Sequence, residues 1–213
     1  MTVEIIPTIF STSKKEFEQR FEKLVTISKK IQVDIMDGKF VKTKSFQPKD
    51  LPDFRKYKNS FEAHLMVKDP VKLFVTLKKK GFKKIVFHYE ALKSDEKVEE
   101  TINILQYMNM DPVLAINPET KIEKIIPFLK KIKTIQIMGI KPGKEGQTLL
   151  SQTYKRITNL KKIKPSLKIQ IDGGVNETTA KKLVKSGANI LTTGSFVMKS
   201  EDPKKAIKIL QNA

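Results

Sequence analysis

The chain has 213 residues, and 42 Lys or Arg against 23 Asp or Glu give a formal net charge of +19. Hydrophobic residues at 39%, with only 9 Gly and 10 Pro, exclude a collagenous or low-complexity chain, and the length suits one globular domain over residues 1–213. The absence of cysteine excludes disulfide bonds, thiolate nucleophiles and Cys-ligated zinc, so a metal site would need His, carboxylate or amide groups.

Short apolar segments rich in β-branched residues alternate with longer stretches of helical periodicity along the whole chain. This alternation predicts repeated βα units and a parallel sheet. The expected strands are Val3–Pro7, Ile31–Met36, Phe61–Val67, Lys84–His88, Pro112–Ile116, Thr134–Gly139, Lys168–Asp172 and Asn189–Thr193.

The stretches between these strands carry helix signals. Ser13 precedes the first periodic run, and Asn176 is placed to cap a later helix. Gly81 and Gly187 stand where glycines commonly end helices. The expected apolar faces are those of Phe17, Phe21, Leu24 and Val25 in the first helix and of Ala180, Leu183 and Val184 in the later one.

Eight βα units without a linker predict an α/β fold, a single (β/α)8 TIM barrel. The alternative is an open Rossmann-type sheet, but no G-x-G-x-x-G motif follows the first strand. In a barrel the active site lies at the C-terminal ends of the strands. Polar residues at those ends are therefore the candidates for function.

Polar side chains interrupt three of the expected strands near their C-terminal ends. Because side chains two apart in a strand point the same way, Asp34, His64 and Asp172 can converge on one barrel mouth. Polar groups on an apolar strand cost free energy unless they are paired or bind a ligand. Two carboxylates and one imidazole therefore predict an acid/base or metal site. The faces that share this alternation are Gln32, Asp34 and Met36 in one strand and Glu62, His64 and Met66 in the next.

The positive charge is scattered rather than gathered in one basic arm. Arginine, which suits bidentate recognition of phosphates, occurs only at Arg20, Arg55 and Arg156, so lysine accounts for 42 − 3 = 39 residues. We interpret the lysines as solvated helix faces and expect no nucleic-acid partner, with adventitious or specialised nucleic-acid binding as the alternative. No apolar run is long enough to cross a bilayer, and no signal-peptide layout opens the chain, so we expect a cytoplasmic protein without a membrane partner.

Six segments resemble the ribulose-phosphate 3-epimerase family in their order and spacing. They are Val33–Gly38, Ala63–Val67, Ile116–Pro118, Met138–Gly143 with Gly146 and Gln147, Ile171–Asn176, and Gly194 with Ser195. The resemblance covers nearly the whole chain and extends to near relatives such as allulose-6-phosphate epimerases. It implies a (β/α)8 barrel, a divalent metal, a homo-oligomer, and interconversion of the phosphosugars D-ribulose 5-phosphate and D-xylulose 5-phosphate.

The resemblance also implies roles for matching positions. Asp34 and Asp172 match the acid/base pair of a two-base proton transfer through an enediolate. A zinc, iron, manganese or cobalt ion would be held by Asp34, His64 and Asp172, with Gln32 as a questionable fourth ligand. His88 matches a position outside the metal set, where we expect a structural role. The matching substrate positions are Thr8, Met36, His64, Met66, Met138, Gly143, Gly146, Gln147, Gly173, Gly174, Gly194 and Ser195.

Three positions depart from the family pattern. Gln32 stands where the family has its first metal-binding histidine, which predicts weaker metal binding and favours harder ions such as Mn²⁺ or Mg²⁺. Glu145 replaces a glycine of the phosphate loop and would repel a phosphate dianion if it faced inward. Thr8 replaces a serine and keeps its hydroxyl. The alternatives are therefore an epimerase for another ketose phosphate, such as allulose 6-phosphate, a hexulose-phosphate synthase, or a catalytically impaired phosphosugar-binding barrel.

Overall fold

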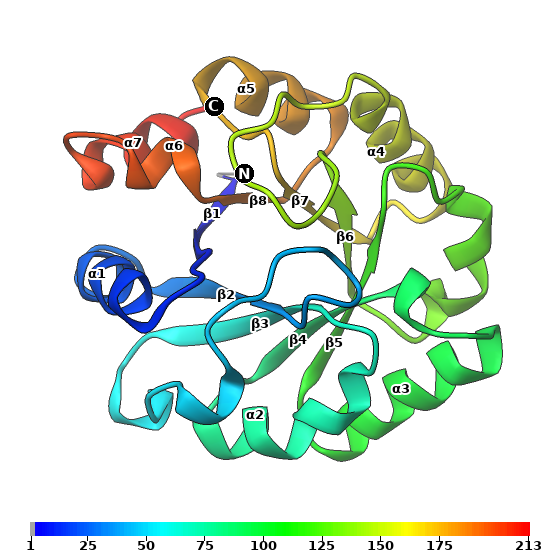
Figure 1. Cartoon of the computed structure of the whole chain (residues 1–213). Helices are drawn as coiled ribbons and strands as arrows, with labels where there is room; N and C mark the ends of the chain where they lie inside the picture. The colour runs from blue at the N-terminus through cyan, green and yellow to red at the C-terminus, as the bar shows by residue number, and fades with distance from the viewer. Residues whose placement is uncertain (1–2) are drawn as a thin grey trace.

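The computed structural model describes residues 3–213 as a closed barrel of eight parallel strands in sequence order (Figure 1). The ring closes where β1 pairs with β8. The strands are β1 (Glu4–Ile9), β2 (Lys30–Met36), β3 (Ser60–Met66), β4 (Lys84–His88), β5 (Asp111–Ile116), β6 (Thr134–Met138), β7 (Lys168–Asp172) and β8 (Ile190–Thr193). The predicted (β/α)8 TIM-barrel fold class is confirmed.

The predicted end of β1 was wrong. Pro7 does not end the strand, which continues to Ile9, because Pro7 stays in register with Thr193 of β8 while Thr8 begins to pair with Gln32 of β2. A single missing backbone donor does not stop a strand that has neighbours on both sides. Thr8 therefore lies within β1 rather than after it. The other strands begin and end within one residue of their predicted bounds.

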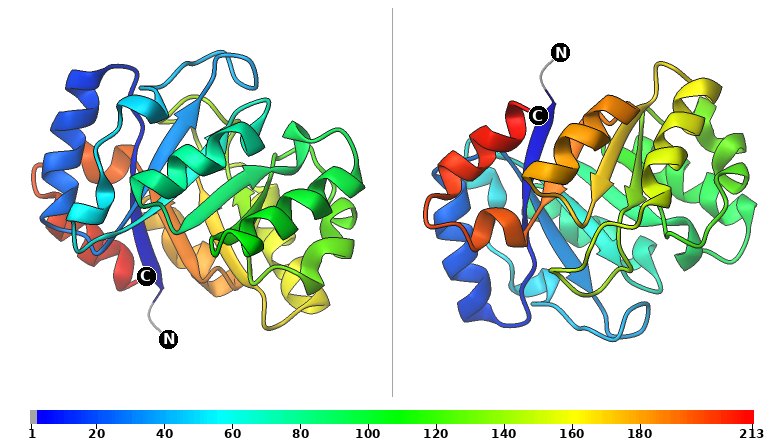
Figure 2. Two further views of the ribbon diagram at one scale, coloured as in Figure 1. Left: turned by 90° about the horizontal axis from the view of Figure 1, so that it is seen from below. Right: turned by 90° about the horizontal axis from the view of Figure 1, so that it is seen from above.

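Helices surround the barrel on its outside (Figures 1 and 2). The α-helices are α1 (Lys14–Val25), α2 (Phe74–Lys80), α3 (Asp95–Tyr107), α4 (Gln152–Ile163), α5 (Glu177–Ser186), α6 (Ser195–Met198) and α7 (Pro203–Gln211). The 3₁₀ segments are η1 (Pro48–Asp50), η2 (Phe54–Lys56), η3 (Pro70–Leu73), η4 (Tyr89–Ala91) and η5 (Ile122–Lys130). Among residues 3–213, no helix has the length and apolar character needed to cross a membrane.

Two of the seven connections between strands depart from the expected βα pattern, because they hold 3₁₀ segments in place of an α-helix. The connection from β2 to β3 contains η1 and η2, and the connection from β5 to β6 contains η5. Pro127 lies inside η5, where it removes a backbone donor that an α-helix would use.

The predicted helix caps are confirmed. Ser13 accepts a hydrogen bond from the Glu16 amide at the start of α1. Asn176 and Thr179 exchange side-chain to backbone bonds at the start of α5. Gly81 and Gly187 end α2 and α5 with φ of +95° and +111°, which is the left-handed region that glycine adopts without strain.

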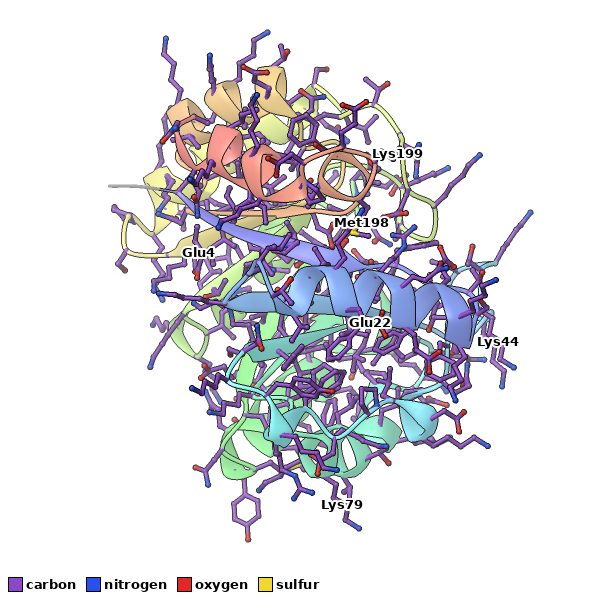
Figure 3. All side chains as sticks on the ribbon, turned by 90° about the vertical axis from the view of Figure 1, so that its left-hand side faces the viewer. Glu4, Glu22, Lys44, Lys79, Met198 and Lys199 are labelled. Atoms are coloured by element: carbon purple, nitrogen blue, oxygen red, sulfur yellow. The ribbon has the colours of Figure 1, made fainter. Side chains whose placement is uncertain are left out.

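The apolar core lies between the outer face of the strands and the helices, whereas the inside of the barrel is rich in polar groups. Val86, Val113 and Ala115 form a small separate apolar cluster. The polar side chains buried on the strands include Gln32, Glu62, His64, His88, Gln136 and Gln170. In Figure 3, Glu4 at the start of β1 and Lys44 in the loop after β2 lie at opposite ends of the barrel, and the strands run toward the Lys44 end. That end is the mouth.

Candidate active site

Asp34, His64 and Asp172 meet at the mouth of the barrel, from β2, β3 and β7. The Nδ1 atom of His64 lies 3.1 Å from Oδ1 of Asp34 and 3.1 Å from Oδ2 of Asp172. His64 is 1% exposed and Asp34 is 7% exposed. The structure thus brings together the three side chains that strand alternation selected.

Two glutamine amides hold the carboxylates of this cluster. The Nε2 atom of Gln32 donates to Oδ1 of Asp34 and to Oδ2 of Asp172, both at 2.9 Å. Nε2 of Gln136 in β6 donates to the same Asp172 oxygen at 3.2 Å. These hydrogen bonds offset part of the free-energy cost of burying the two carboxylates.

Burial and charge shift the acidity of the cluster. Burial raises the pKa of Asp34, although the hydrogen bond from His64 opposes this shift. Burial alone would lower the pKa of His64, but its hydrogen bonds to Asp172 and Asp34 outweigh burial and raise it. Nδ1 of His64 is therefore placed between the two carboxylate oxygens, within hydrogen-bond distance of both.

His88 forms the second layer behind His64. The Nε2 atoms of the two imidazoles are 2.9 Å apart, and Nδ1 of His88 is 3.3 Å from Oε2 of Glu90. Burial lowers the pKa of His88, and its two ring nitrogens lie within hydrogen-bond distance of His64 and Glu90. Both ring nitrogens of His88 have partners, in agreement with the predicted structural role.

A column of polar side chains continues from the site toward the other end of the barrel. Nε2 of Gln170 donates to Oε1 of Gln136 at 2.9 Å and to Oε1 of Glu62 at 2.6 Å. Oε2 of Glu62 pairs with Nζ of Lys84 at 3.0 Å. The amide of Gln170 thereby orients the amide that contacts Asp172.

The cluster fits a divalent cation. Asp34, His64 and Asp172 each offer one ligand atom, and these atoms lie within 4.8 Å of one another. Two carboxylates and one imidazole form a donor set that suits zinc, iron, manganese or cobalt. Gln32 turns its amide nitrogen toward the carboxylates, and in this orientation it is a hydrogen-bond donor to the ligands rather than a ligand itself.

A cavity opens above the cluster. Most of the predicted substrate positions line it: Thr8, His64, Met66, Met138, Gly143, Gly146, Gly173, Gly174, Gly194 and Ser195. Thr192 also lines this cavity, and its hydroxyl is buried without a partner among residues 3–213. The volume that water can reach inside is about 50 Å³, which is room for a few water molecules.

Two predicted substrate residues do not line the cavity. Met36 is 1% exposed and belongs to the buried part of β2. Nε2 of Gln147 donates to the carbonyls of Lys141 and Lys144, both at 2.7 Å, so its amide holds the loop between β6 and α4 instead. The glycines at the end of β7 are required by packing, because a Cβ on Gly173 would lie 2.2 Å from Cγ1 of Ile140.

Glu145 turns inward, toward the position of the expected phosphate. An ideal Cβ on Gly194 would lie 2.1 Å from Oε1 of Glu145 and 2.7 Å from Oγ1 of Thr8. Arg20 of α1 binds both oxygens of this carboxylate. The carboxylate of Glu145 therefore faces the expected phosphate region, and the guanidinium of Arg20 accompanies it.

Sequence reasoning missed several residues of the site. Gln136 and Gln170 stand two positions before Met138 and Asp172, so the alternation that selected Asp34 could have found them. Arg20 had no comparable signal, because it lies 125 positions from Glu145 in the chain.

Comparisons with known proteins agree with this geometry. A family model described as the ribulose-phosphate 3 epimerase family matches residues 4–198. The ribulose-phosphate 3-epimerase of Schizosaccharomyces pombe is 31% identical over 187 residues, which covers 86% of this chain and 81% of that protein. The cytoplasmic isoform of ribulose-phosphate 3-epimerase from Oryza sativa subsp. japonica is 26% identical over 215 residues, which covers 99% of this chain and 93% of that protein.

Solved structures share the fold at low sequence identity. The 3-hexulose-6-phosphate synthase of Salmonella typhimurium superposes with a TM-score of 0.72 at 12% identity, and the match covers 98% of this chain and 97% of that one. This likeness concerns the fold alone.

Proposed function

The chain belongs to the ribulose-phosphate 3-epimerase family, a family of isomerases, and we propose that it interconverts D-ribulose 5-phosphate and D-xylulose 5-phosphate. The observation that carries the proposal is the pair of aspartates, Asp34 on β2 and Asp172 on β7, whose carboxylates meet at the mouth of the barrel and share one imidazole. Epimerisation next to a ketone needs one group to remove a proton from one face and another to return a proton to the opposite face.

The chain's own residues account for the proton transfers. One aspartate takes the C3 proton of the substrate, and the other donates a proton to the opposite face of the planar enediolate. The raised pKa of Asp34 helps it to hold a proton between the two transfers near neutral pH. Met66 and Met138 line the cavity and exclude water from the carbanionic centre.

A divalent cation held by Asp34, His64 and Asp172 would supply a Lewis acid that stabilises the negative charge of the enediolate. Zinc, iron, manganese and cobalt suit these ligands, and the missing fourth ligand at Gln32 lowers the expected affinity.

The test compares Asp34→Asn and Asp172→Asn with the wild type in a coupled assay of D-ribulose 5-phosphate conversion. Each variant should lose at least about 10²-fold in turnover, because each removes one of the two proton-transfer groups. Asp69→Asn, in an exposed ion pair with Lys72, is the matched control and should turn over normally. Thermal unfolding verifies the fold. Near wild-type turnover by either site variant contradicts the assignment.

Substrate choice, location and assembly are further parts of the proposal. Allulose 6-phosphate, offered in the same assay, tests the alternative ketose phosphate. Binding of both sugars without conversion of either would instead support a barrel that has lost catalysis.

The name of the rice relative, a cytoplasmic isoform, supports a cytoplasmic location. The family resemblance supports a homo-oligomer, which sedimentation of the purified protein tests.

A further inference from the structure

Glu145, which lines the cavity, forms an ion pair with Arg20. The two terminal nitrogens of Arg20, on α1, donate to the two oxygens of Glu145 at 3.1 and 3.0 Å. The same guanidinium also binds Oε1 of Glu16 at 3.1 Å, one turn earlier on α1. The side chains of Arg20 and Glu145 are only 17% and 23% exposed. Arg20 thus lies between two carboxylates in a partly desolvated setting.

The carboxylate of Glu145 occupies the space in which an anion would rest on Gly194. Its Oε1 atom lies 2.1 Å from the position of a Cβ on that glycine, so it is packed directly against the backbone. Little volume remains in the cavity beside it. A phosphate group on Gly194 and the Glu145 carboxylate therefore exclude each other.

The loop between β6 and α4 carries Glu145 at its tip, and other residues hold the base of this loop in place. Oγ1 of Thr43 donates to the Gly143 carbonyl at 2.7 Å, and the Gln147 amide binds two carbonyls of the loop. Gly146 has φ of +78° and open space where a Cβ would be. A change in the backbone conformation at Gly146 can therefore move Glu145 away from Arg20 without breaking the hydrogen bonds of Thr43 and Gln147.

We propose that the phosphate of the substrate replaces the Glu145 carboxylate on Arg20, so that Arg20 is a phosphate ligand and Glu145 is a built-in competitor. A guanidinium binds carboxylates and phosphates with the same two-donor geometry, and it remains oriented by Glu16 during the exchange. The exchange favours phosphate dianions over uncharged sugars or monoanions, which bring less charge to displace a paired carboxylate. This inference rests on the phosphosugar function proposed above.

The test measures binding of inorganic phosphate to the full chain by calorimetry. Glu145→Gln keeps the size of the side chain but removes its charge, and it should tighten phosphate binding about tenfold. Adding Arg20→Gln to this variant should weaken binding about tenfold. Arg55→Gln is the matched control, because Arg55 binds Asp53 with the same two-donor geometry on the exposed η2 segment. It should bind phosphate like the wild type.

The double variant separates the two possible roles of Arg20. If Arg20 only anchored Glu145, its removal would change nothing once Glu145 carries no charge, and that result overturns the proposal. Unchanged phosphate affinity in Glu145→Gln overturns it as well. If Arg20→Gln fails to fold, phosphate binding is measured instead with Arg20→Lys in the Glu145→Gln background. This substitution keeps the positive charge but removes the two parallel N–H donors of the guanidinium. Undiminished affinity in that variant also contradicts the proposal.

Phosphate binding is independent of turnover, so the two proposals can fail separately. The predicted affinity pattern in a protein that does not convert D-ribulose 5-phosphate supports the exchange on Arg20 and contradicts the epimerase activity. Turnover with no effect of Glu145→Gln on phosphate affinity or on KM contradicts the exchange and leaves the epimerase activity in place.

Discussion

Gln32 holds the two aspartates of the site together, because one amide nitrogen donates to both carboxylates. The same interaction sets the limit on metal binding. An amide that donates to the ligands stabilises their negative charge without adding a bond to a cation. Gln32 therefore organises the two aspartates in the absence of a cation, but it leaves only three side chains that can bind a metal ion.

Gln32→His should tighten the binding of Zn²⁺ or Mn²⁺ about tenfold or more, since it adds an imidazole beside Asp34. Calorimetric titration of chelator-stripped protein measures this change. Gln47→His is the control, because the Gln47 amide binds the Ser45 carbonyl in the loop after β2. Equal metal affinity in Gln32→His and the wild type would show that position 32 does not limit the site.

The main side chains of the site were predictable from strand alternation, since Asp34, His64 and Asp172 sit near the ends of apolar strands. The direction of the Glu145 side chain was not predictable. It depends on a partner on α1, and nothing local in the loop specifies that contact. Met36 lies on the same strand face as Asp34 but does not line the cavity, so strand alternation alone does not determine which residues line it.

At the scale of elements, the predicted helix ends were reliable, because the residues that cap a helix interact with the backbone of that same helix. Ser13, Asn176 and the two terminal glycines act within one turn, so the sequence predicts them without tertiary information. The end of β1 was predicted less well than the other strand bounds. The extension of β1 beyond Pro7 depends on its register with β2 and β8.

Asp37 ties the loop after β2 to the loop after β3. Its carboxylate accepts hydrogen bonds from the backbone amides of Lys39, Phe40 and Lys68 at 2.7–2.9 Å. Asp37→Asn should reduce the free energy of unfolding by about 1 kcal/mol near pH 7. This is below the usual value for charged hydrogen bonds, because the group is partly exposed to solvent. Denaturant titration measures the loss, with Asp69→Asn as the exposed control.

The effect of Asp37 should depend on pH. Burial opposes ionisation, but the three amide bonds outweigh it and hold the pKa of Asp37 below its ordinary value of 3.8. A carboxyl with a lowered folded-state pKa stabilises the fold above the unfolded-state pKa, and this stabilisation is lost as the pH falls through the folded-state value. The difference between wild type and Asp37→Asn should therefore be full at neutral pH and shrink below about pH 4. A constant difference across this range contradicts the account.

At the scale of the whole molecule, the charge of +19 is distributed around the barrel. Figure 3 shows long side chains that end in nitrogen projecting from several sides, with Lys44 in the loop after β2, Lys79 on α2 and Lys199 directly after α6. We expect duplex DNA to bind weakly at about 20 mM salt and to dissociate by about 200 mM, as non-specific electrostatic binding does. Fluorescence anisotropy measures this dependence. Tight binding that persists at the higher salt concentration would favour a nucleic-acid function.

The most direct test of the central claim is conversion of D-ribulose 5-phosphate to D-xylulose 5-phosphate in D₂O. It uses chelator-stripped protein, with Zn²⁺, Fe²⁺, Mn²⁺, Co²⁺ or Mg²⁺ added back in turn. We predict metal-dependent turnover, with solvent deuterium at C3 of the product, because the proton returned to C3 comes from an aspartate that exchanges with solvent. Folded protein that converts none of the sugar with any of these metals would contradict the assignment of Asp34 and Asp172 as an epimerase pair.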